Sequence, residues 1–145
     1  MSANFKPSVR LSVQTRDRCE LIDITDRVRD AIRKQEVREG VVYLHVPHTT
    51  AALCINENAD PDVKHDLLRK LETLIPKDEP YYRHAEGNSD SHLKAILTGT
   101  GLTVMIEAGR LVLGQWQGIY FCEFDGPRAR ELVLRCLDGT RAPLS

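Results

Sequence analysis

The order of its secondary-structure signals constrains this chain more than any other feature. Alternating apolar and polar residues indicate strands over 8–15 and 19–24, which we expect to pair as a hairpin. Further strands are expected over 41–46, 102–107, 110–113, 115–124 and 131–137. Helical segments interrupt these strands irregularly, unlike the repeated strand–helix–strand unit of parallel sheets. We therefore predict an α+β fold: a single compact domain over residues 1–145, with an irregular, mainly antiparallel sheet and about three helices.

The clearest helix signal covers residues 61–75. Asp60 stands at the N-cap position, and Pro61 occupies the first helical position, where its missing N–H costs nothing. The predicted apolar stripe of this helix consists of Val63, Leu67, Leu71 and Leu74. Two shorter helices are expected over 26–36 and 90–97.

The charge balance limits the classes of partner. The chain has 20 Lys and Arg residues against 21 Asp and Glu, a formal net charge of −1, so it has no general field for holding nucleic acid or an anionic membrane. No apolar run approaches the ~20 residues that span a bilayer, and the N-terminal segment lacks the apolar centre of a signal peptide. We expect a cytoplasmic protein with a small-molecule ligand, and four free thiols at Cys19, Cys54, Cys122 and Cys136.

Five histidines are the main candidates for chemistry. His45 lies within a predicted strand and is interpreted as a half-buried sheet residue. His65 lies on the polar side of the 61–75 helix and is interpreted as solvated. His48 differs because it follows Pro47 at a strand end, where side chains are well placed for function. A loop histidine bonded to nearby backbone is the alternative for His48.

His84 and His92 flank a short polar segment, 85–91, that contains a glycine. His92 falls in the first turn of the predicted 90–97 helix, where the helix dipole opposes protonation and leaves the imidazole neutral. Two such histidines and a third, His48, are a common composition for a three-histidine metal site with one open position. Surface histidines bonded to hydroxyls or carboxylates are the alternative, and the spacing alone does not decide.

Several other polar residues are candidates for lining a ligand site. Asn56 and Glu57 precede the 61–75 helix and are not needed to cap it, so one of them can face a ligand or hold a histidine. In the 115–124 strand, Gln117 and Glu123 share one face, which lines a pocket or meets another subunit. The opposite face, which includes Trp116, is interpreted as core.

Two arginines lie beside a tight Asp-Gly-Pro turn. Arg128 and Arg130 can clamp a phosphate or a carboxylate. They can equally pair with the nearby carboxylates of Glu123 and Asp125. The sequence leaves both interpretations open.

Taken together, these residues resemble the YjbQ-like family over roughly residues 5–140. The matching motifs are His48-Thr49-Thr50-Ala51, Asn56-Glu57-Asn58, Asp60-Pro61, His84, Ser91-His92, Gly99-Thr100, Gly114-Gln115-Trp116-Gln117 and Glu123. The resemblance implies a compact α+β domain that assembles as a homotrimer. It also implies that His48, His84 and His92 form the polar site, with Glu57, Asn88 and Glu123 close by.

The resemblance implies a reaction as well. The family carries the label secondary thiamine-phosphate synthase, which forms thiamine phosphate from a pyrimidine diphosphate and a thiazole phosphate as a side activity. Three imidazoles favour zinc as the divalent metal, with Glu57 or Glu123 as general base. The expected substrate contacts are Asn56, Asn88, Gln117 and Arg128. The chain has no glycine-rich phosphate loop, so a metal-dependent hydrolase of a small metabolite, a non-catalytic binding module and a trimer scaffold stay open.

Overall fold

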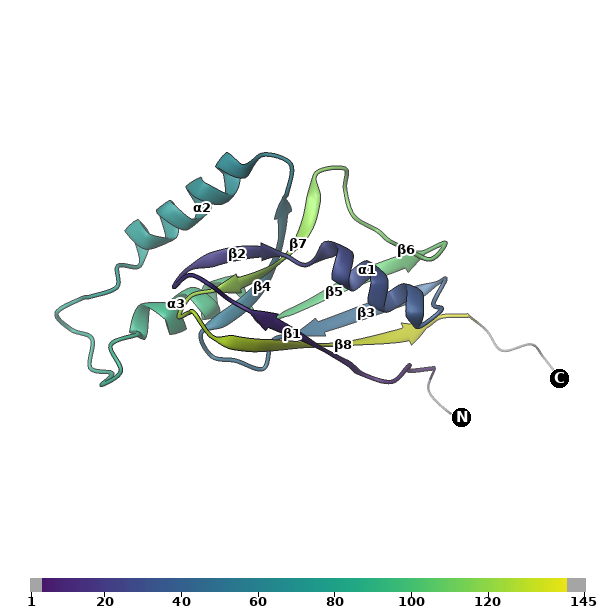
Figure 1. The fold of residues 1–145 in the computed structure, drawn as a ribbon, viewed down its shortest axis with the longest axis horizontal. Helices are drawn as coiled ribbons and strands as arrows, with labels where there is room; N and C mark the ends of the chain where they lie inside the picture. Colours follow the sequence, from purple (N-terminus) through teal and green to yellow (C-terminus); the bar gives the residue numbers. More distant parts are fainter. Residues whose placement is uncertain (1–3, 141–145) are drawn as a thin grey trace.

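The strands form two antiparallel sheets (Figure 1), and the computed structural model describes residues 4–140. The larger sheet has the order β1 (Val9–Gln14), β8 (Ala129–Asp138), β3 (Gly40–His45), β5 (Gly101–Glu107) and β6 (Arg110–Leu111). The smaller sheet has the order β2 (Glu20–Asp23), β7 (Gln117–Glu123) and β4 (Ala51–Glu57). Every strand pair is antiparallel. The predicted α+β class is confirmed.

Three helices accompany the sheets: α1 (Thr25–Lys34), α2 (Pro61–Leu74) and α3 (Ser89–Thr98). The start of α2 follows the sequence signal, because Asp60 Oδ1 accepts a hydrogen bond from the backbone N–H of Asp62 at 2.9 Å. Within residues 4–140, no helix is long and apolar enough to cross a bilayer.

The main hydrophobic core lies between the two sheets and α1. Its fully buried members include Val28, Ile32, Val42, Leu53, Ile119, Phe121, Leu132 and Leu134. Each such side chain contributes roughly 1.5–3 kcal/mol of transfer free energy when it leaves water. Among residues 4–140, side chains on the outer face of the larger sheet stay open to solvent: Tyr43 is 43 % exposed and Met105 is 55 % exposed.

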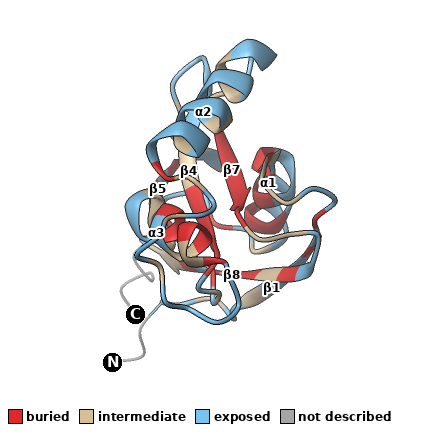
Figure 2. Cartoon of the chain, turned by 90° about the vertical axis from the view of Figure 1, so that its left-hand side faces the viewer, coloured by how far each residue is buried: buried red, intermediate tan, exposed pale blue. Residues whose placement is uncertain are grey.

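Strand β7 is buried on both faces, as Figure 2 shows by its colour. Ile119 and Phe121 enter the main core. Tyr120 and Cys122 enter a second cluster, which also includes Ala95 of α3. The prediction that Trp116 belongs to the core face of this strand is wrong: Trp116 precedes β7 in a turn and is 56 % exposed.

The predicted hairpin of the first two strands is wrong. β1 pairs with β8 and β2 pairs with β7, because residues 15–19 carry the chain from the larger sheet to the smaller one. Strand β4 is not among the predicted strands; its alanines and its terminal Asn56 and Glu57 have low strand propensity. Pairing with β7 along its whole length compensates for that weakness.

The apolar stripe predicted for α2 is only partly correct. Leu67 is 37 % exposed and Leu74 is 62 % exposed, and no residue of this helix is fully buried. Leu68 and Leu71 pack against the second cluster instead. The helix therefore rests on the domain along one narrow edge.

Candidate functional site

Three connecting segments cross between the sheets at one end of the molecule. Residues 15–19 join β1 to β2, residues 46–50 join β3 to β4, and residues 124–128 join β7 to β8. Each segment begins or ends beside a polar side chain that bonds to another of the three. We call this region the sheet junction, and it positions the candidate site residues.

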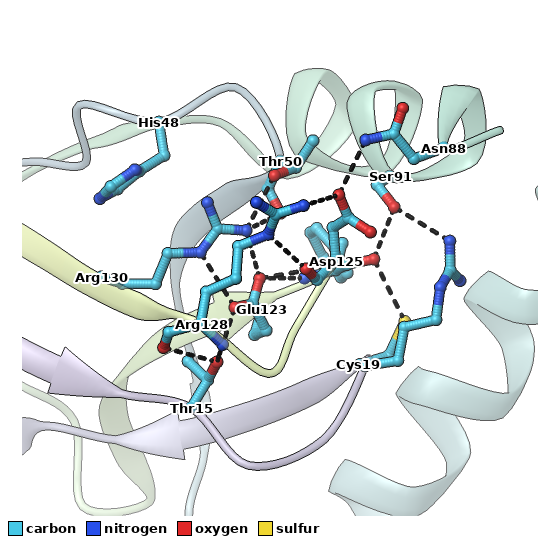
Figure 3. A network of polar contacts seen from close by, with 12 residues as sticks. Thr15, Cys19, His48, Thr50, Asn88, Ser91, Glu123, Asp125, Arg128 and Arg130 are labelled. Carbon is cyan, nitrogen blue, oxygen red and sulfur yellow. Dashed lines mark hydrogen bonds and ion pairs between the residues drawn. The ribbon is translucent and has the colours of Figure 1, made fainter. Parts of the chain in front are cut away.

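A buried ion pair holds the sheet junction together (Figure 3). Arg130 donates from Nε to Glu123 Oε1 at 2.9 Å and from Nη2 to Oε2 at 2.6 Å, and the two side chains are 5 % and 0 % exposed. Thr15 Oγ1 also donates to Oε1 at 2.7 Å, and the backbone N–H groups of Phe124 and Asp125 donate to Oε2. Arg130 Nη2 additionally donates to Thr50 Oγ1 at 2.8 Å.

Glu123 is therefore fully engaged inside the protein. Its two oxygens accept five hydrogen bonds, which occupies the roughly four lone-pair positions that a carboxylate offers. Such a carboxylate is suited to holding chain segments together. It is less suited to taking a proton from a substrate. The general-base role of Glu123 stays a prediction.

His48 is attached to the sheet junction through β8. The backbone N–H of Glu131 donates to His48 Nε2 at 3.0 Å. That bond uses the lone pair of Nε2, so the imidazole carries its proton on Nδ1. Burial and, after it, the positive charge of Arg130 hold the pKa of His48 below its ordinary value. His48 thus presents a neutral ring with an N–H donor.

His48 and His92 line the same hollow, which has a volume of about 490 Å³. Its other lining residues are Thr49, Ala95, Ile96, Gly99 and Thr100. His84 meets His92 edge-on, with ring centroids 5.3 Å apart and an interplanar angle of 76°. His48 and His92 therefore open on one hollow, which we call the histidine hollow, and His84 adjoins it through His92. His45 and His65 are exposed on β3 and α2, apart from it.

The fit of these histidines to a metal is incomplete within one chain. Across residues 4–140, no three His, Cys, Asp or Glu side chains come close enough together to hold an ion. His84 and His92 are neighbours, but His48 would have to release the Glu131 N–H before Nε2 could bind a metal. The three-histidine zinc site stays a prediction.

Asn88 and Arg128 meet at Asp125. Asn88 Nδ2 donates to Asp125 Oδ2 at 2.7 Å, and Arg128 Nη2 donates to the same oxygen at 2.9 Å. Asn88 Oδ1 is buried, and no group among residues 4–140 donates to it. The two arginines thus pair with neighbouring carboxylates, Arg130 with Glu123 and Arg128 with Asp125. The Arg128 side chain is half exposed and can still meet an anion.

Asn56, Glu57 and Gln117 lie at the far end of the smaller sheet. In the register of β4 and β7, Glu57 is opposite Gln117, whereas Ala51 is opposite Glu123. Six residues of strand separate these two positions, a distance of about 20 Å. Within one chain, the structure does not bring these three predicted residues to the histidine hollow.

The sequence reasoning missed a second buried charge cluster. Asp90 accepts two hydrogen bonds from Arg18, at 3.0 and 2.9 Å, and one from Lys94 at 3.0 Å. Burial works to raise the pKa of Asp90, but the bonds from Arg18 and Lys94 outweigh it, and the pKa lies below its ordinary value. The i, i+4 spacing of Asp90 and Lys94 was a usable signal, whereas Arg18, 72 residues away, gave none.

Similarity to known proteins covers nearly the whole chain. The family described as UPF0047 protein YjbQ-like matches residues 9–139. The UPF0047 protein MJ1081 of Methanocaldococcus jannaschii is 48 % identical over 133 residues, 92 % of this chain and 96 % of that protein. The UPF0047 protein YugU of Bacillus subtilis is 46 % identical over 127 residues, which cover 88 % of this chain and 96 % of that protein.

Solved structures agree with the fold. A protein of the yjbq/upf0047 family from Clostridium acetobutylicum superposes with a TM-score of 0.87 at 46 % identity, covering 89 % of this chain and 99 % of the other. The conserved hypothetical protein TT1486 from Thermus thermophilus gives a TM-score of 0.83 at 48 % identity, with the same coverage of both chains.

Proposed function

The chain belongs to the YjbQ-like UPF0047 family, and from this premise we propose that the histidine hollow binds a divalent metal ion, zinc by preference, and a small anionic metabolite. The observation that carries the proposal is the shared position of the histidines: His48 and His92 open on one hollow, and His84 contacts His92. Imidazole nitrogens are good zinc ligands. A zinc ion bound there would polarise a substrate oxygen or activate a water.

The chain's own residues supply the rest of the proposed site. His48 offers an N–H donor at the hollow while its Nε2 accepts from Glu131, and it would join the metal only after releasing that bond. The Glu123–Arg130 ion pair positions the segment that carries His48, through Thr50 and β8. Arg128, half exposed at the same end of the molecule, is the proposed contact for a phosphate.

The reaction we propose to test is the one that the family resemblance suggests, formation of thiamine phosphate from a pyrimidine diphosphate and a thiazole phosphate. Untagged protein is incubated with both substrates and zinc, and thiamine phosphate is quantified. We expect turnover that His48→Ala lowers at least ten-fold and that His65→Ala, a change on the exposed face of α2, leaves unaltered. Equal losses in the two variants, or no product from the wild type, would count against the synthase.

A non-catalytic binding module is the second candidate, and one observation favours it. Among the described residues that line the histidine hollow, none is a carboxylate, and Glu123 is engaged in its ion pair. The nearest carboxylate to these histidines is Glu86, whose Oε2 lies 3.8 Å from His84 Nε2, and it stands outside the lining of the hollow. A general base is therefore lacking among the residues that line the hollow in a single chain. Zinc binding without consumption of any phosphorylated substrate would favour this second candidate over the enzyme.

A homotrimer and a cytoplasmic location belong to the proposal as well. The outer face of the larger sheet exposes Tyr43 and Met105, and the turn before β7 exposes Trp116. Such apolar exposure is common where subunits meet. Light scattering in solution should give three times the mass of the chain, and the mass of a single chain would contradict this part of the proposal.

A further inference from the structure

A second cavity, of about 480 Å³, lies between α2, α3 and the start of β2. It is separate from the histidine hollow, because His92 and Ile96 of α3 line the hollow whereas Lys94 lines the cavity. We infer that this cavity, which we call the α2 pocket, binds a small amphiphilic anion: a carboxylate or phosphate head on a short apolar body. The inference does not depend on the proposed function of the histidines.

One wall of the α2 pocket is apolar and only partly covered. Leu68 and Leu71 of α2 face Cys19 and Phe124 across it. No residue of α2 is fully buried, and Figure 2 shows the helix largely exposed above the rest of the domain. An apolar ligand body placed here would remove leucine surface from water at about 25 cal/mol per Å².

The rest of the lining is polar and mostly cationic, and it also contains His65. Arg18, Arg69, Lys77 and Lys94 line the α2 pocket, and Glu72 is the carboxylate among the lining residues. Arg69 pairs with Glu72 at 3.3 Å on the exposed side. Even when buried Asp90 is counted with Arg18 and Lys94, the cations outnumber the carboxylates by two, so the pocket attracts an anion.

Lys94 is the feature that points most directly to a ligand. The residue is 2 % exposed, and its ammonium donates to Asp90 at 3.0 Å. Among residues 4–140, Asp90 is its one hydrogen-bond acceptor, although an ammonium has three N–H donors. A carboxylate or phosphate oxygen in the α2 pocket would take one of the remaining donors.

The dimensions suit a small molecule. Pockets for small ligands typically have volumes of about 300–1,000 Å³, with mostly apolar walls and a few polar groups that fix orientation. The α2 pocket has that composition, with leucines on one side and the Arg18–Asp90–Lys94 cluster on the other. An alkyl chain with an anionic head offers one group to each side, and octanoate and octyl phosphate serve as probes of that kind.

Calorimetric titration of the full chain with octanoate, octyl phosphate and octan-1-ol tests the charge requirement. We expect both anions to bind, and the neutral alcohol to bind at least ten-fold more weakly. Equal affinity for the alcohol, or no heat from either anion at millimolar concentration, would overturn the inference. A clear preference between octanoate and octyl phosphate would identify the head group.

A matched pair of variants tests the location. Lys77→Glu reverses a charge in the lining, whereas Lys70→Glu makes the same change on the exposed part of α2, outside the lining. We expect Lys77→Glu to weaken octanoate binding about five-fold and Lys70→Glu to leave it unchanged. Equal weakening by both variants would mean that octanoate responds only to net charge, and would overturn the α2 pocket as its site.

Cys19 gives an independent readout of occupancy. Its thiol lines the α2 pocket, whereas Cys54, also partly exposed, lies outside the lining. We expect octanoate to slow alkylation of Cys19 several-fold and to leave Cys54 unaffected, as followed by peptide mass spectrometry. Protection of neither thiol, or of both equally, would contradict binding at this place. His92→Ala should leave the protection intact, which separates this site from the histidine hollow.

Discussion

The sheet junction and the histidine hollow are neighbouring polar regions with opposite properties. At the junction, Glu123 and Arg130 are almost completely buried, and each oxygen of the carboxylate has its donors. At the hollow, His92 is half-buried and meets the exposed His84 edge-on, and the carboxylate of Glu86 lies 3.8 Å from His84 Nε2. A buried polar group whose partners are all within the chain stabilises the fold, whereas an exposed or half-buried imidazole beside a hollow is available to a ligand.

The largest effect should follow from breaking the junction. Arg130→Met leaves the Glu123 carboxylate buried without its cation, and we expect a loss of about 3–5 kcal/mol in the free energy of unfolding. Urea denaturation measures it. Arg128→Met is the matched control, because Arg128 is half exposed and pairs with Asp125 near the surface, so its loss should stay at about 1 kcal/mol or less. Similar losses of stability in both variants would contradict the distinction between the buried ion pair of the sheet junction and the half-exposed Arg128.

The second buried cluster should behave like the junction on a smaller scale. Asp90→Asn removes the charge that Arg18 and Lys94 share, and we expect it to lower stability by about 2 kcal/mol at pH 7. Because the pKa of Asp90 is lowered in the folded state, its stabilisation is present above the ordinary value of about 3.9 and is lost as the pH falls through the folded pKa.

The stability difference between wild type and Asp90→Asn should therefore shrink on acidification. Urea denaturation at a series of pH values from neutral to acid measures it. A difference that is constant with pH would show that Asp90 acts by packing and not by charge.

His48 links the two regions, so its replacement should have an intermediate effect. His48→Ala removes the acceptor of the Glu131 N–H, and we expect a loss of about 1 kcal/mol at pH 8. Since burial and the charge of Arg130 lower the pKa of His48, the stabilisation is full above pH ~6.5 and declines as the pH falls below it. His45→Ala, on the exposed face of β3, is the control and should lower stability by less than about 0.5 kcal/mol at pH 8.

The smallest effect is expected at the far end of β4. Glu57→Gln should change stability by less than about 0.5 kcal/mol and leave zinc affinity unaltered, because about 20 Å of strand separates this residue from the hollow. Zinc titration of the variant measures the affinity. A marked loss of zinc affinity would contradict this separation. It would mean that Glu57 of one subunit lies beside the histidine hollow of another.

Local signals predicted the helices and most strands, but not how the strands pair. The Asp60-Pro61 start of α2 is a property of adjacent residues, and it is confirmed. The pairing of β1 with β8 joins Val9 to Leu134, and no local signal carries that information. Strand β4 has a weak strand propensity and is held by its pairing with β7. Because that pairing is not a local property, the sequence did not predict this strand.

The same distinction applies to the site. His48 and His92 could be selected from their positions at element ends, and His84 from its place across a short loop and from the family resemblance. The structure puts His48 and His92 on one hollow and His84 against His92. Glu123 could be selected as polar, but its engagement with Thr15 and Arg130 depends on contacts across the sheet junction. Asn56 and Glu57 were selected by their place before α2, and Gln117 by its strand face, and strand register places them at the far end of the smaller sheet.

Zinc binding by the untagged chain tests the central claim most directly. The wild type, His92→Ala and His65→Ala are titrated with zinc by calorimetry, and bound metal is counted after gel filtration. We expect about one zinc per chain in the wild type and in His65→Ala, and at least a ten-fold loss of affinity in His92→Ala. A wild type that binds no zinc, or a His92→Ala variant that binds it as tightly, would contradict the histidine hollow as a metal site.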